Sequence, residues 1–458
     1  RLKGVKILEG VLVTGVTTNN GRATGVTTTQ GTIEAEFVVN CAGLWARQLG
    51  ALSGVCSPHQ TTEHYYLITE PFEGMTSDLP LIEDPSCHGY YREETGGLMI
   101  GLFEPVCAPW MVDGVPDDFS FGEIAPDWNR MTPFLEKAMS RIPISTEVGI
   151  SKFFCGPESF TPDLGVAFGE SAEIENYFVA AGLNSIGIIT GGGLGKIMAQ
   201  WITTGDPGAD ITPINVDRFH PYQCNPEYRK TRVVEILGMV YRRHYPTRVP
   251  ETARDCKRSP FHEHLLRERA FFTDVSGWES PAWYAPEGKE PVVEKLSWGR
   301  QNWFPYWEAE HRACREGVIA MDMTFMGKFL VQGRDAGKVL DHISANSVNG
   351  PVETITYTQW LNERGLIEAD VTVTKLTEEK FIVVVTDTMH RHVETWLRRH
   401  IPAGAHCFMT DITGGIGQLN VQGPRSRALL QSITSADLSN EAFPFRTSRQ
   451  IDIGYALL

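Results

Sequence analysis

Positive charge and long apolar runs are both scarce in this chain of 458 residues. Its 41 Lys and Arg residues are outnumbered by 56 Asp and Glu residues, and the formal net charge is −15. That charge disfavours nucleic acids and anionic membranes as partners, because phosphate groups are bound by clustered cations. No apolar run approaches the roughly 20 residues that span a bilayer. Hydrophobic residues make up 42% of the chain, so we expect a globular protein of two or three domains.

Cysteine pairs and metal-ligand spacings are missing as well. The nine cysteines are odd in number and include no C-x-x-C pair, which predicts reduced thiols in a reducing compartment. The H-E-x-x-H motif is absent, and the spacing in His262-Glu263-His264 does not put two histidines on one helical face. We therefore expect no metal site.

The most glycine-rich segment, Gly182–Lys196, does not match any of three standard motifs. A P-loop needs Gly and Ser or Thr at the positions of Thr190 and Ile197. The Rossmann fingerprint G-x-G-x-x-G needs Gly where Lys196 stands, and a nucleophile elbow needs Gly two residues before Ser185. The segment therefore belongs to none of these three classes.

The same segment does contain a strand, small residues and a helix in succession. Tyr177–Gly182 is an apolar, β-branched and aromatic run that predicts a buried strand, and Ile197–Ile202 predicts a helix. The glycines between them predict a loop whose backbone N–H groups approach a flat or anionic ligand near the positive end of a helix. A glycine-rich packing turn without a ligand is the alternative that this segment alone leaves open.

A second unit of this kind occurs near the start of the chain. Residues 5–40 predict a β-meander with turns at residues 19–21 and 30–31. Its last run, Phe37–Gly43, predicts a buried strand that ends on Ala-Gly and is followed by a helix from Trp45. Such a turn also suits a cofactor, and a plain strand-to-helix turn is the alternative.

The composition and the periodicity of the remaining chain change twice. Residues 60–155 predict a β-rich layer with a hairpin around residues 90–101 and a helix near 128–141. Residues 216–300 are rich in Arg, His, Pro and Trp and have weak periodicity, which indicates a connector. From Met321 onward strands and helices follow one another in an α+β pattern, which predicts a further domain.

Taken together, several segments resemble the dimethylglycine and sarcosine dehydrogenase family, FAD-dependent oxidoreductases of N-methylated glycines. These segments follow the family's order and are Asn40–Ala46, Cys155–Asp163, Gly182–Lys196, Arg218-Phe219, Arg258–Pro260, Gly277–Glu279, Met321–Met323, Gly327–Phe329, Gly423-Pro424 and Ala436–Phe445. The last segment is most similar to the sarcosine branch.

The resemblance implies a multidomain α/β and α+β fold. Residues 1–215 would be the C-terminal part of a glutathione-reductase-like FAD domain, with a substrate-binding β-sheet layer at about 57–150. Residues 216–300 would be the connector domain, and residues 301–458 the N-terminal part of an aminomethyltransferase-like, folate-binding domain. FAD and tetrahydrofolate are the implied cofactors.

The chain departs from the family at both ends. The family's N-terminal dinucleotide fingerprint, its early histidine that often bonds covalently to FAD, and the end of its folate domain are not found. The sequence also starts at Arg1 and stops at Leu458 within strand-like runs. We therefore expect a fragment that is inactive alone and holds FAD poorly.

The resemblance implies FAD contacts at eleven positions. Val13 would lie near the adenine, and Ala42, Gly43 and Trp45 would line the path of the dinucleotide. The contacts expected nearer the flavin are at Gly182, Asn184, Ser185, Gly187, Ile188, Ile189 and Lys196.

Catalytic candidates lie on a predicted strand, His64–Thr69, that resembles the family's H-x-Y-x-x-T strand. Tyr66 matches the family's proposed active-site tyrosine, and His64 is a second candidate because alternate strand residues share a face. Tyr91 and Arg92 could hold a substrate carboxylate, which the guanidinium fork of arginine fits. A structural sheet histidine and a solvated surface arginine are the alternatives.

The folate domain offers one further candidate. Asp370 matches the aspartate that assists near the folate nitrogen in the related aminomethyltransferase, and the alternative is an ordinary carboxylate at a strand edge. The implied reaction passes a one-carbon unit from an N-methylated glycine to tetrahydrofolate, as in the breakdown of choline and glycine betaine.

Several alternatives stay open. The electron acceptor would be a flavoprotein or oxygen, and the compartment either the bacterial cytoplasm or the mitochondrial matrix. The regulatory subunit of pyruvate dehydrogenase phosphatase resembles the same family, so a non-catalytic interaction subunit is the second hypothesis. Tyr66 and Asp370 favour the enzyme.

Overall fold

The structure is a computed structural model that describes residues 4–458. It divides into two compact units, which are Arg1–His244 with Pro250–Ala253 and Tyr245–Val249 with Arg254–Leu458. The strand-like start expected at residues 1–3 lies outside the described residues. The division falls inside the expected connector, so domain limits at 215 and 300 stay predictions. Within the described part of the chain, no helix has the length and hydropathy to cross a membrane.

The first unit begins with the predicted meander. It consists of β1 (Val13–Asn19), β2 (Arg22–Thr28) and β3 (Gly31–Glu34), paired antiparallel in that order. Both predicted turns are confirmed, and Asn20 and Gly21 adopt the positive φ angles of 50° and 78° that a two-residue hairpin turn requires.

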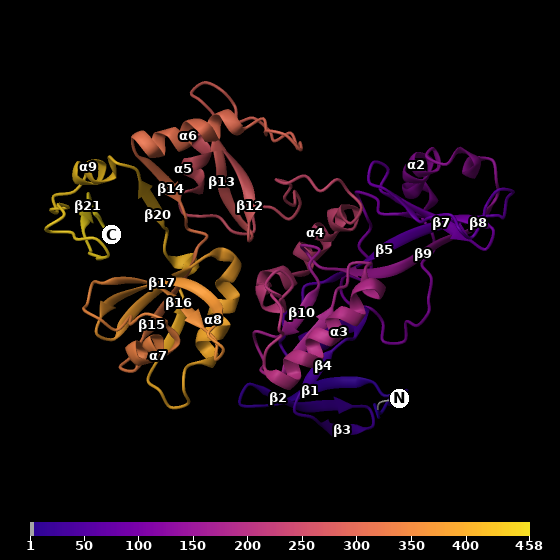
Figure 1. The fold of residues 1–458 in the computed structure, drawn as a ribbon, viewed down its shortest axis with the longest axis horizontal. Coiled ribbons are helices and arrows are strands. Elements are labelled where there is room, and N and C mark those ends of the chain that lie inside the picture. The colour runs from indigo at the N-terminus through magenta and orange to yellow at the C-terminus, as the bar shows by residue number, and fades with distance from the viewer. Residues whose placement is uncertain (1–3) are drawn as a thin grey trace. The chain divides into compact units, whose positions relative to one another are not determined.

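A second sheet in the first unit joins segments that are far apart in the sequence. Its strand order is β10 (Ala167–Glu170), β11 (Tyr177–Ala181) and β4 (Val38–Asn40), and β4 runs parallel to β11. Alternate residues of β11 face two different cores. Phe178 packs with Met198 and other residues of α3 (Gly187–Thr204), whereas Tyr177 belongs to a core with Ala46 and Phe219. The sheet is thus covered on both faces, with α3 running beside it in Figure 1.

The third sheet of this unit is antiparallel and has five strands. Their order is β6 (Ile82–Asp84), β7 (Gly89–Glu94), β8 (Gly97–Leu102), β5 (Gln60–Thr69) and β9 (Ile150–Phe160). The predicted hairpin is therefore confirmed. One face packs on α2 (Trp128–Met139) through Tyr65, Leu67 and Met131. The opposite face carries His64 and Tyr66, because strand residues alternate.

The helix α3 corrects one sequence interpretation. The segment Gly182–Lys196 is not a loop, because α3 begins at Gly187 and carries five glycines in the sequence GIITGGGLGKIMAQWITT. Each helical glycine costs about 1 kcal/mol relative to alanine. Burial of apolar side chains contributes roughly 1.5–3 kcal/mol each, and Leu194, Ile197, Met198 and Trp201 all pack on the sheet. Tertiary packing therefore outweighs local propensity, and the loop shrinks to residues 182–186.

Two other helices complete the first unit. The short α1 (Ala46–Ala51) follows β4, and α4 (Pro226–Met239) begins at the N-cap Asn225, whose side chain accepts the backbone N–H of Glu227. Proline at the first helical position suits this start, since its missing N–H would have no partner there. The helix α4 packs on Phe103 and Phe160 through Val233, Ile236 and Leu237.

The second unit contains a hairpin, a two-stranded pair and a larger sheet. The hairpin is β12 (Ala270–Val275) with β13 (Trp278–Tyr284), and the pair is β14 (Ile319–Asp322) with β20 (Leu419–Gln422). The larger sheet has the order β16 (Ile355–Leu361), β17 (Ile367–Thr377), β18 (Lys380–Val385), β15 (Gly327–Gln332) and β19 (Phe408–Asp411). It shares one core with α7 (Ala336–Ile343) and α8 (His390–Arg399). The remaining elements are α5 (His262–Arg267), α6 (Phe304–Glu316), α9 (Ser426–Gln431), β21 (Asp452–Ile453) and β22 (Ala456–Leu457).

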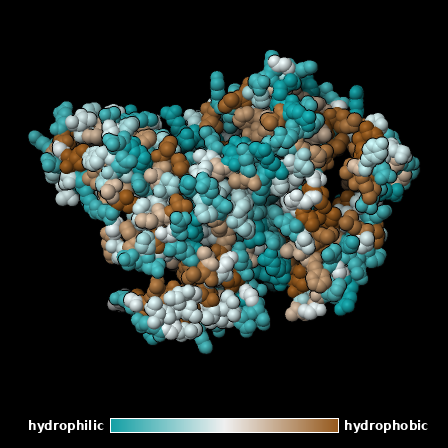
Figure 2. Space-filling model, turned by 180° about the vertical axis from the view of Figure 1, so that it is seen from behind, coloured by the Kyte–Doolittle hydropathy of each residue, from teal (hydrophilic) through white to brown (hydrophobic). Residues whose placement is uncertain are grey.

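The α+β pattern predicted from Met321 onward is confirmed by these elements. Apolar side chains also break the mostly hydrophilic surface of the chain (Figure 2). Among the exposed ones are Ile188 and Ile189 in the first turn of α3, at 105% and 85% relative exposure.

The helical state of the glycines is testable by Gly193→Ala. No atom lies within 4 Å of an added Cβ, and Gly193 is not in the left-handed region. We expect the free energy of unfolding, measured by urea denaturation with circular dichroism, to rise by about 0.5–1 kcal/mol. The matched control is Gly205→Ala, which should destabilise because Gly205 caps α3 with a φ of 78°. Destabilisation by Gly193→Ala would mean that this segment is a loop.

Candidate functional site

Two turns meet at one edge of the β10–β11–β4 sheet. The register Val179↔Asn40 in the parallel pair β11–β4 puts the carboxyl ends of both strands together. Residues 41–45 therefore lie beside residues 180–186. The crevice outside the carboxyl ends of parallel strands is where open α/β sheets bind ligands.

The first turn is shaped by the buried side chain of Asn40. Its Nδ2 donates to the carbonyl of Ala46 at 2.8 Å and to the hydroxyl of Tyr177 at 3.0 Å, and its Oδ1 accepts the N–H of Ala42 at 3.2 Å. Gly43 follows with a φ of 55°. The indole of Trp45 donates to the carbonyl of Pro116 at 2.9 Å, so Ala42, Gly43 and Trp45 share one fixed turn.

The second turn, residues 182–186, is held by Asn184. Its Oδ1 accepts the backbone N–H of Thr161 at 2.8 Å, and its Nδ2 donates to the carbonyl of Leu164 at 2.9 Å. Asn184 and Ser185 have positive φ angles of 50° and 68°. A Cβ on Gly182 would lie 2.7 Å from the Cγ2 of Thr161, so only glycine fits there. The loop is thereby pinned to the end of β9.

The N-terminus of α3 is open to a ligand. Its N-cap residue Ile186 provides no side-chain hydrogen bond, and the first N–H groups of an α-helix carry partial positive charge. An added Cβ on Gly191, Gly192, Gly193 or Gly195 would meet no atom within 4 Å. This donor set and this side-chain-poor face fit the electron-rich edge of a flavin ring.

An ion pair between a buried histidine and a half-buried glutamate joins the second turn to the antiparallel sheet. The Nδ1 of His64 on β5 lies 2.8 Å from the Oε2 of Glu158 on β9, and Ser185 also hydrogen-bonds the Glu158 carboxylate. Burial alone would lower the pKa of His64, but the charge and hydrogen bond of Glu158 raise it. Burial would raise the pKa of Glu158, and His64 with Ser185 lowers it. The pair therefore favours its charged form.

The second ring nitrogen of His64 has no protein partner. Its Nε2 is buried and makes no hydrogen bond to any described residue. A buried unpaired donor costs about 1–3 kcal/mol, so such an atom indicates a position for a ligand group. The ring of Phe103 lies against His64 at a centroid distance of 4.5 Å.

Tyr66 lies on the same sheet face as His64, as predicted from strand alternation. Its ring stacks on Phe154 at a centroid distance of 4.5 Å and an interplanar angle of 20°. The registers Tyr66↔Gly101 and Tyr90↔Gly101 bring Tyr90 to this face too. An added Cβ on Gly101 would lie 1.7 Å from the Tyr90 ring, so this glycine makes room for Tyr90. The face is an aromatic floor of Tyr66, Tyr90 and Phe154.

Of the two residues expected to hold a substrate carboxylate, only one lies on this face. Tyr91 is 1% exposed on the α2 side of the sheet, where its hydroxyl donates to the carbonyl of Ala138 at 3.0 Å. Arg92 shares the face of Tyr66 but is exposed and pairs with Glu94 at 2.6 Å. The structure therefore does not bring Tyr91 to Tyr66, because adjacent strand residues point to opposite faces.

The other residues expected to contact the cofactor lie on β1 and α3. Val13 opens β1 and is half-buried. Gly187, Ile188 and Ile189 form the first turn of α3, and Lys196 lies exposed further along the same helix. Glu158, Tyr90 and Phe154 were not singled out from the sequence. These residues come to His64 and Tyr66 through the pairing of β5 with β9 and β8 and of β8 with β7. The sequence of a single strand does not show which strands pair with it.

Asp370 belongs to the second unit. It is exposed on β17 and accepts a hydrogen bond from the hydroxyl of Tyr357 on β16 at 2.6 Å. That bond raises the pKa of Tyr357. On the same strand Glu368 pairs with His392 of α8 at 3.0 Å.

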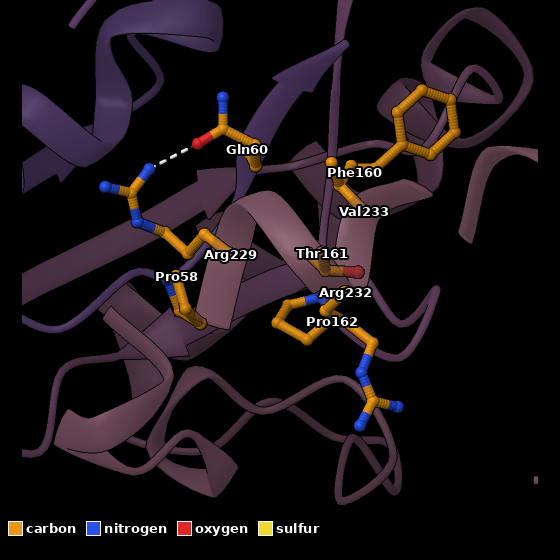
Figure 3. Close-up of a pocket in the computed structure, with 8 residues that line it drawn as sticks. All are labelled: Pro58, Gln60, Phe160, Thr161, Pro162, Arg229, Arg232 and Val233. Atoms are coloured by element: carbon orange, nitrogen blue, oxygen red, sulfur yellow. Dashed lines mark hydrogen bonds between the residues drawn. The ribbon is translucent and has the colours of Figure 1, made fainter. Parts of the chain in front are cut away.

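A small pocket of the first unit lies next to the second turn. Its empty volume is about 150 Å³, and it is lined by Pro58, Gln60, Phe160, Thr161, Pro162, Arg229, Arg232 and Val233. Arg229 hydrogen-bonds the Oε1 of Gln60, whereas the Arg232 guanidinium points away from that bond (Figure 3). The pocket is too small for a flavin.

Three family patterns match almost the whole chain. They are described as FAD dependent oxidoreductase for residues 1–201, FAD dependent oxidoreductase central domain for residues 204–259, and GCVT N-terminal domain for residues 261–458. The predicted multidomain fold class, with an oxidoreductase part followed by an aminomethyltransferase-like part, is confirmed by these matches.

Curated relatives match over nearly the full chain. The 4-methylaminobutanoate oxidase (formaldehyde-forming) of Paenarthrobacter nicotinovorans is 37% identical over 99% of this chain and 55% of its own length. Human mitochondrial sarcosine dehydrogenase is 33% identical over 98% of this chain and 53% of its own length. The mitochondrial pyruvate dehydrogenase phosphatase regulatory subunit of Mus musculus is 31% identical over 99% and 52%. The chain spans about half the length of these relatives.

Among solved structures, an L-proline dehydrogenase from P. horikoshii matches 49% of this chain and 55% of its own, with a TM-score of 0.38 and 24% identity.

The ion pair predicts the titration of His64. In Glu158→Gln the pKa of His64, measured by NMR of its imidazole, should fall, because the raising charge is lost. The pair stabilises the fold fully where both partners are charged even in the unfolded chain, between about pH 4.5 and pH 6.5. Its contribution is lost as pH rises through the raised pKa of His64 and as pH falls through the lowered pKa of Glu158. The substitution should therefore destabilise by about 1 kcal/mol at pH 6 and by less at pH 9.

The matched control is Glu175→Gln, which removes a carboxylate of the same 36% side-chain exposure as Glu158, paired with the exposed Arg22. It should leave the His64 titration unchanged. A His64 pKa that is the same in Glu158→Gln and in the unaltered chain would contradict the pairing.

Proposed function

The chain belongs to the family of FAD-dependent oxidoreductases with a GCVT domain that includes the sarcosine and dimethylglycine dehydrogenases, and on that premise we propose that it takes part in the oxidation of an N-methylated amino acid. The cofactors predicted from the sequence, FAD for the first domain and tetrahydrofolate for the last, are those of the two domain families.

One observation carries this proposal. The turn at residues 182–186 and the aromatic face of β5 meet at Glu158, which contacts Ser185 on one side and His64 on the other. A flavin-contacting loop thus lies directly beside a polar and aromatic surface that suits a small zwitterion. Bound FAD supplies a hydride acceptor for the C–H bond next to the substrate nitrogen.

The residues that would hold FAD come from both turns. We assign the dinucleotide to the turn of Ala42, Gly43 and Trp45, and the flavin to the loop from Gly182 to Ser185 with the first turn of α3. The uncapped N–H groups there would stabilise negative charge on a reduced ring. Val13 and Lys196 remain proposed contacts at the periphery.

We assign His64 a binding role. The charge and hydrogen bond of Glu158 raise the pKa of His64 and so favour the protonated imidazole, and a protonated ring donates well to an anion. The unpaired Nε2 would therefore hold the substrate carboxylate. Arg92 is already paired with Glu94, so it is the weaker candidate for that role.

Tyr66 is then the group nearest the substrate amine. An amine donates a hydride only after its nitrogen has lost a proton, and a positioned hydroxyl can hold or relay that proton. The ring of Tyr66, which stacks on Phe154, would offer its other face to the methylammonium form, which aromatic faces attract. The ring of Phe154 already has the ammonium of Lys152 over it at 5.0 Å.

The names of three enzymatic relatives contain 4-methylaminobutanoate, sarcosine and dimethylglycine. Each of these compounds is an amino acid with at least one methyl group on its nitrogen. We propose sarcosine or dimethylglycine as the substrate and tetrahydrofolate as the one-carbon acceptor, with Asp370 and the bonded Tyr357 hydroxyl on the folate side. The electron acceptor would be a flavoprotein or oxygen, in the bacterial cytoplasm or the mitochondrial matrix.

A regulatory role is the second candidate function. The regulatory subunit from Mus musculus is 31% identical over 99% of this chain. On that interpretation any flavin would be structural and no amine would be oxidised.

Anaerobic spectroscopy of the FAD-loaded, full-length protein separates the two candidates. We expect sarcosine, dimethylglycine or 4-methylaminobutanoate to bleach the flavin band, and glycine to leave it unchanged. Tyr66→Phe keeps the stacked ring and removes the hydroxyl, so the rate of bleaching should fall by about 10²-fold. The control Tyr455→Phe, at a fully exposed position, should have no effect. A flavin that no N-methyl amine bleaches would overturn the enzymatic proposal.

The folate half predicts a different phenotype for Asp370→Asn. Flavin reduction should proceed at the unaltered rate, because Asp370 bonds Tyr357 on the proposed folate side and no residue assigned to FAD. Formation of methylene-tetrahydrofolate, followed by mass spectrometry, should fall at least tenfold while released formaldehyde rises. Equal yields from the variant and the unaltered protein would remove Asp370 from the transfer step.

A further inference from the structure

Two cysteines far apart in the sequence lie in contact in the first unit. Cys56 follows α1, and Cys224 ends the short helix η4 (Pro221–Cys224) just before α4. Their Sγ atoms are 2.7 Å apart across a separation of 168 residues. A disulfide bond measures about 2.05 Å, so the sulfurs need to move by less than 1 Å to bond.

Two arginines, Arg47 and Arg229, act electrostatically on Cys224, and Glu173 opposes them. The guanidinium of Arg229 donates hydrogen bonds to neutral acceptors, which are the carbonyls of Cys224 and Val112 and the side chain of Gln60. Burial, together with the charges of Arg47 and Arg229, lowers the pKa of the neighbouring His59 to about 3. Burial is the larger cause of this shift, and the two arginines add to it.

The positive charge of the two arginines favours a thiolate at Cys224. The hydrogen bond with Cys56 and the charge of Arg229 lower the pKa of Cys224. By contrast, burial raises the pKa values of Cys107 and Cys155 to about 12. Thiolate character and access control the reactivity of cysteine, and both Cys56 and Cys224 are only half-buried.

We propose that Cys56 and Cys224 form a redox-reactive pair that a hydroperoxide converts to a disulfide. The Cys224 thiolate attacks one peroxide oxygen and becomes a sulfenic acid, releasing hydroxide. The Cys56 sulfur then attacks the Cys224 sulfur, the S–OH bond breaks, and water leaves with the Cys56 proton. In sum two thiols and one hydrogen peroxide give one disulfide and two waters, with both sulfurs oxidised and both peroxide oxygens reduced.

The bond would fix the start of α4 relative to the turn after α1. Cys224 directly precedes the N-cap Asn225, and Arg229 in the first turns of α4 bonds Gln60, the first residue of β5 (Figure 3). Four residues further along, β5 carries His64. Oxidation would therefore restrain a segment that is continuous with the substrate-facing strand.

Stepwise oxidation with hydrogen peroxide followed by non-reducing peptide mapping tests the proposal. The tryptic peptide of residues 219–229 contains Cys224 alone, whereas residues 48–92 contain both Cys56 and Cys87. Glu-C cleavage at Glu63 or Glu70 separates Cys56 from Cys87. We expect the Cys56–Cys224 peptide to exceed every other cross-linked pair at least tenfold and to disappear after dithiothreitol.

Serine variants supply the controls. Cys56→Ser should abolish the cross-link and leave Cys224 as a sulfenic acid that dimedone labels. Cys314→Ser should leave the cross-link unchanged, because Cys314 is half-buried on α6 without a second thiol in hydrogen-bonding range among the described residues. Oxidation of other cysteines without a Cys56–Cys224 peptide would overturn the proposal, and so would Cys224 labelling in Cys56→Ser no faster than that of Cys314.

Discussion

The parallel pairing of β4 with β11 holds the candidate site together. It joins residues near 40 to residues near 180, and so brings the turn of Ala42 and Gly43 to the same sheet edge as the turn of Asn184 and Ser185. Each turn is then fixed by one buried asparagine, Asn40 or Asn184, which satisfies backbone groups that the strand ends leave unpaired. Because these amides act locally, the two turns keep their shapes while the sheet sets their spacing.

A charged pair connects this edge to the second sheet. His64 and Glu158 neutralise one another on adjacent strands, and Ser185 extends the contact to the loop of residues 182–186. Partly exposed ion pairs add little net stability, since water screens the attraction. The pair instead fixes positions. It orients the imidazole so that Nε2 makes no hydrogen bond within the described residues, and it connects the loop of residues 182–186 to the aromatic floor of Tyr66, Tyr90 and Phe154.

Local pattern predicted most of the elements, including the meander, the hairpin at residues 89–102 and the strand Tyr177–Ala181. The prediction of a loop at the glycines of α3 was wrong, because the contacts of Leu194 and Trp201 with the sheet stabilise a helix there. Local pattern did not reveal Glu158, since the partner of His64 depends on a strand register across 94 residues. Strand alternation could have separated Tyr91 from Arg92 at the outset. The family resemblance, by contrast, depended on motif order and was confirmed.

The central claim is that both turns and the start of α3 contact one bound FAD. Hydrogen–deuterium exchange of the full-length protein, compared with and without FAD, tests it directly. Bound FAD should slow exchange in peptides covering residues 41–47 and 182–190 together. Protection that is absent from both peptides, or confined to one of them, would contradict a shared site at the β4–β11 edge.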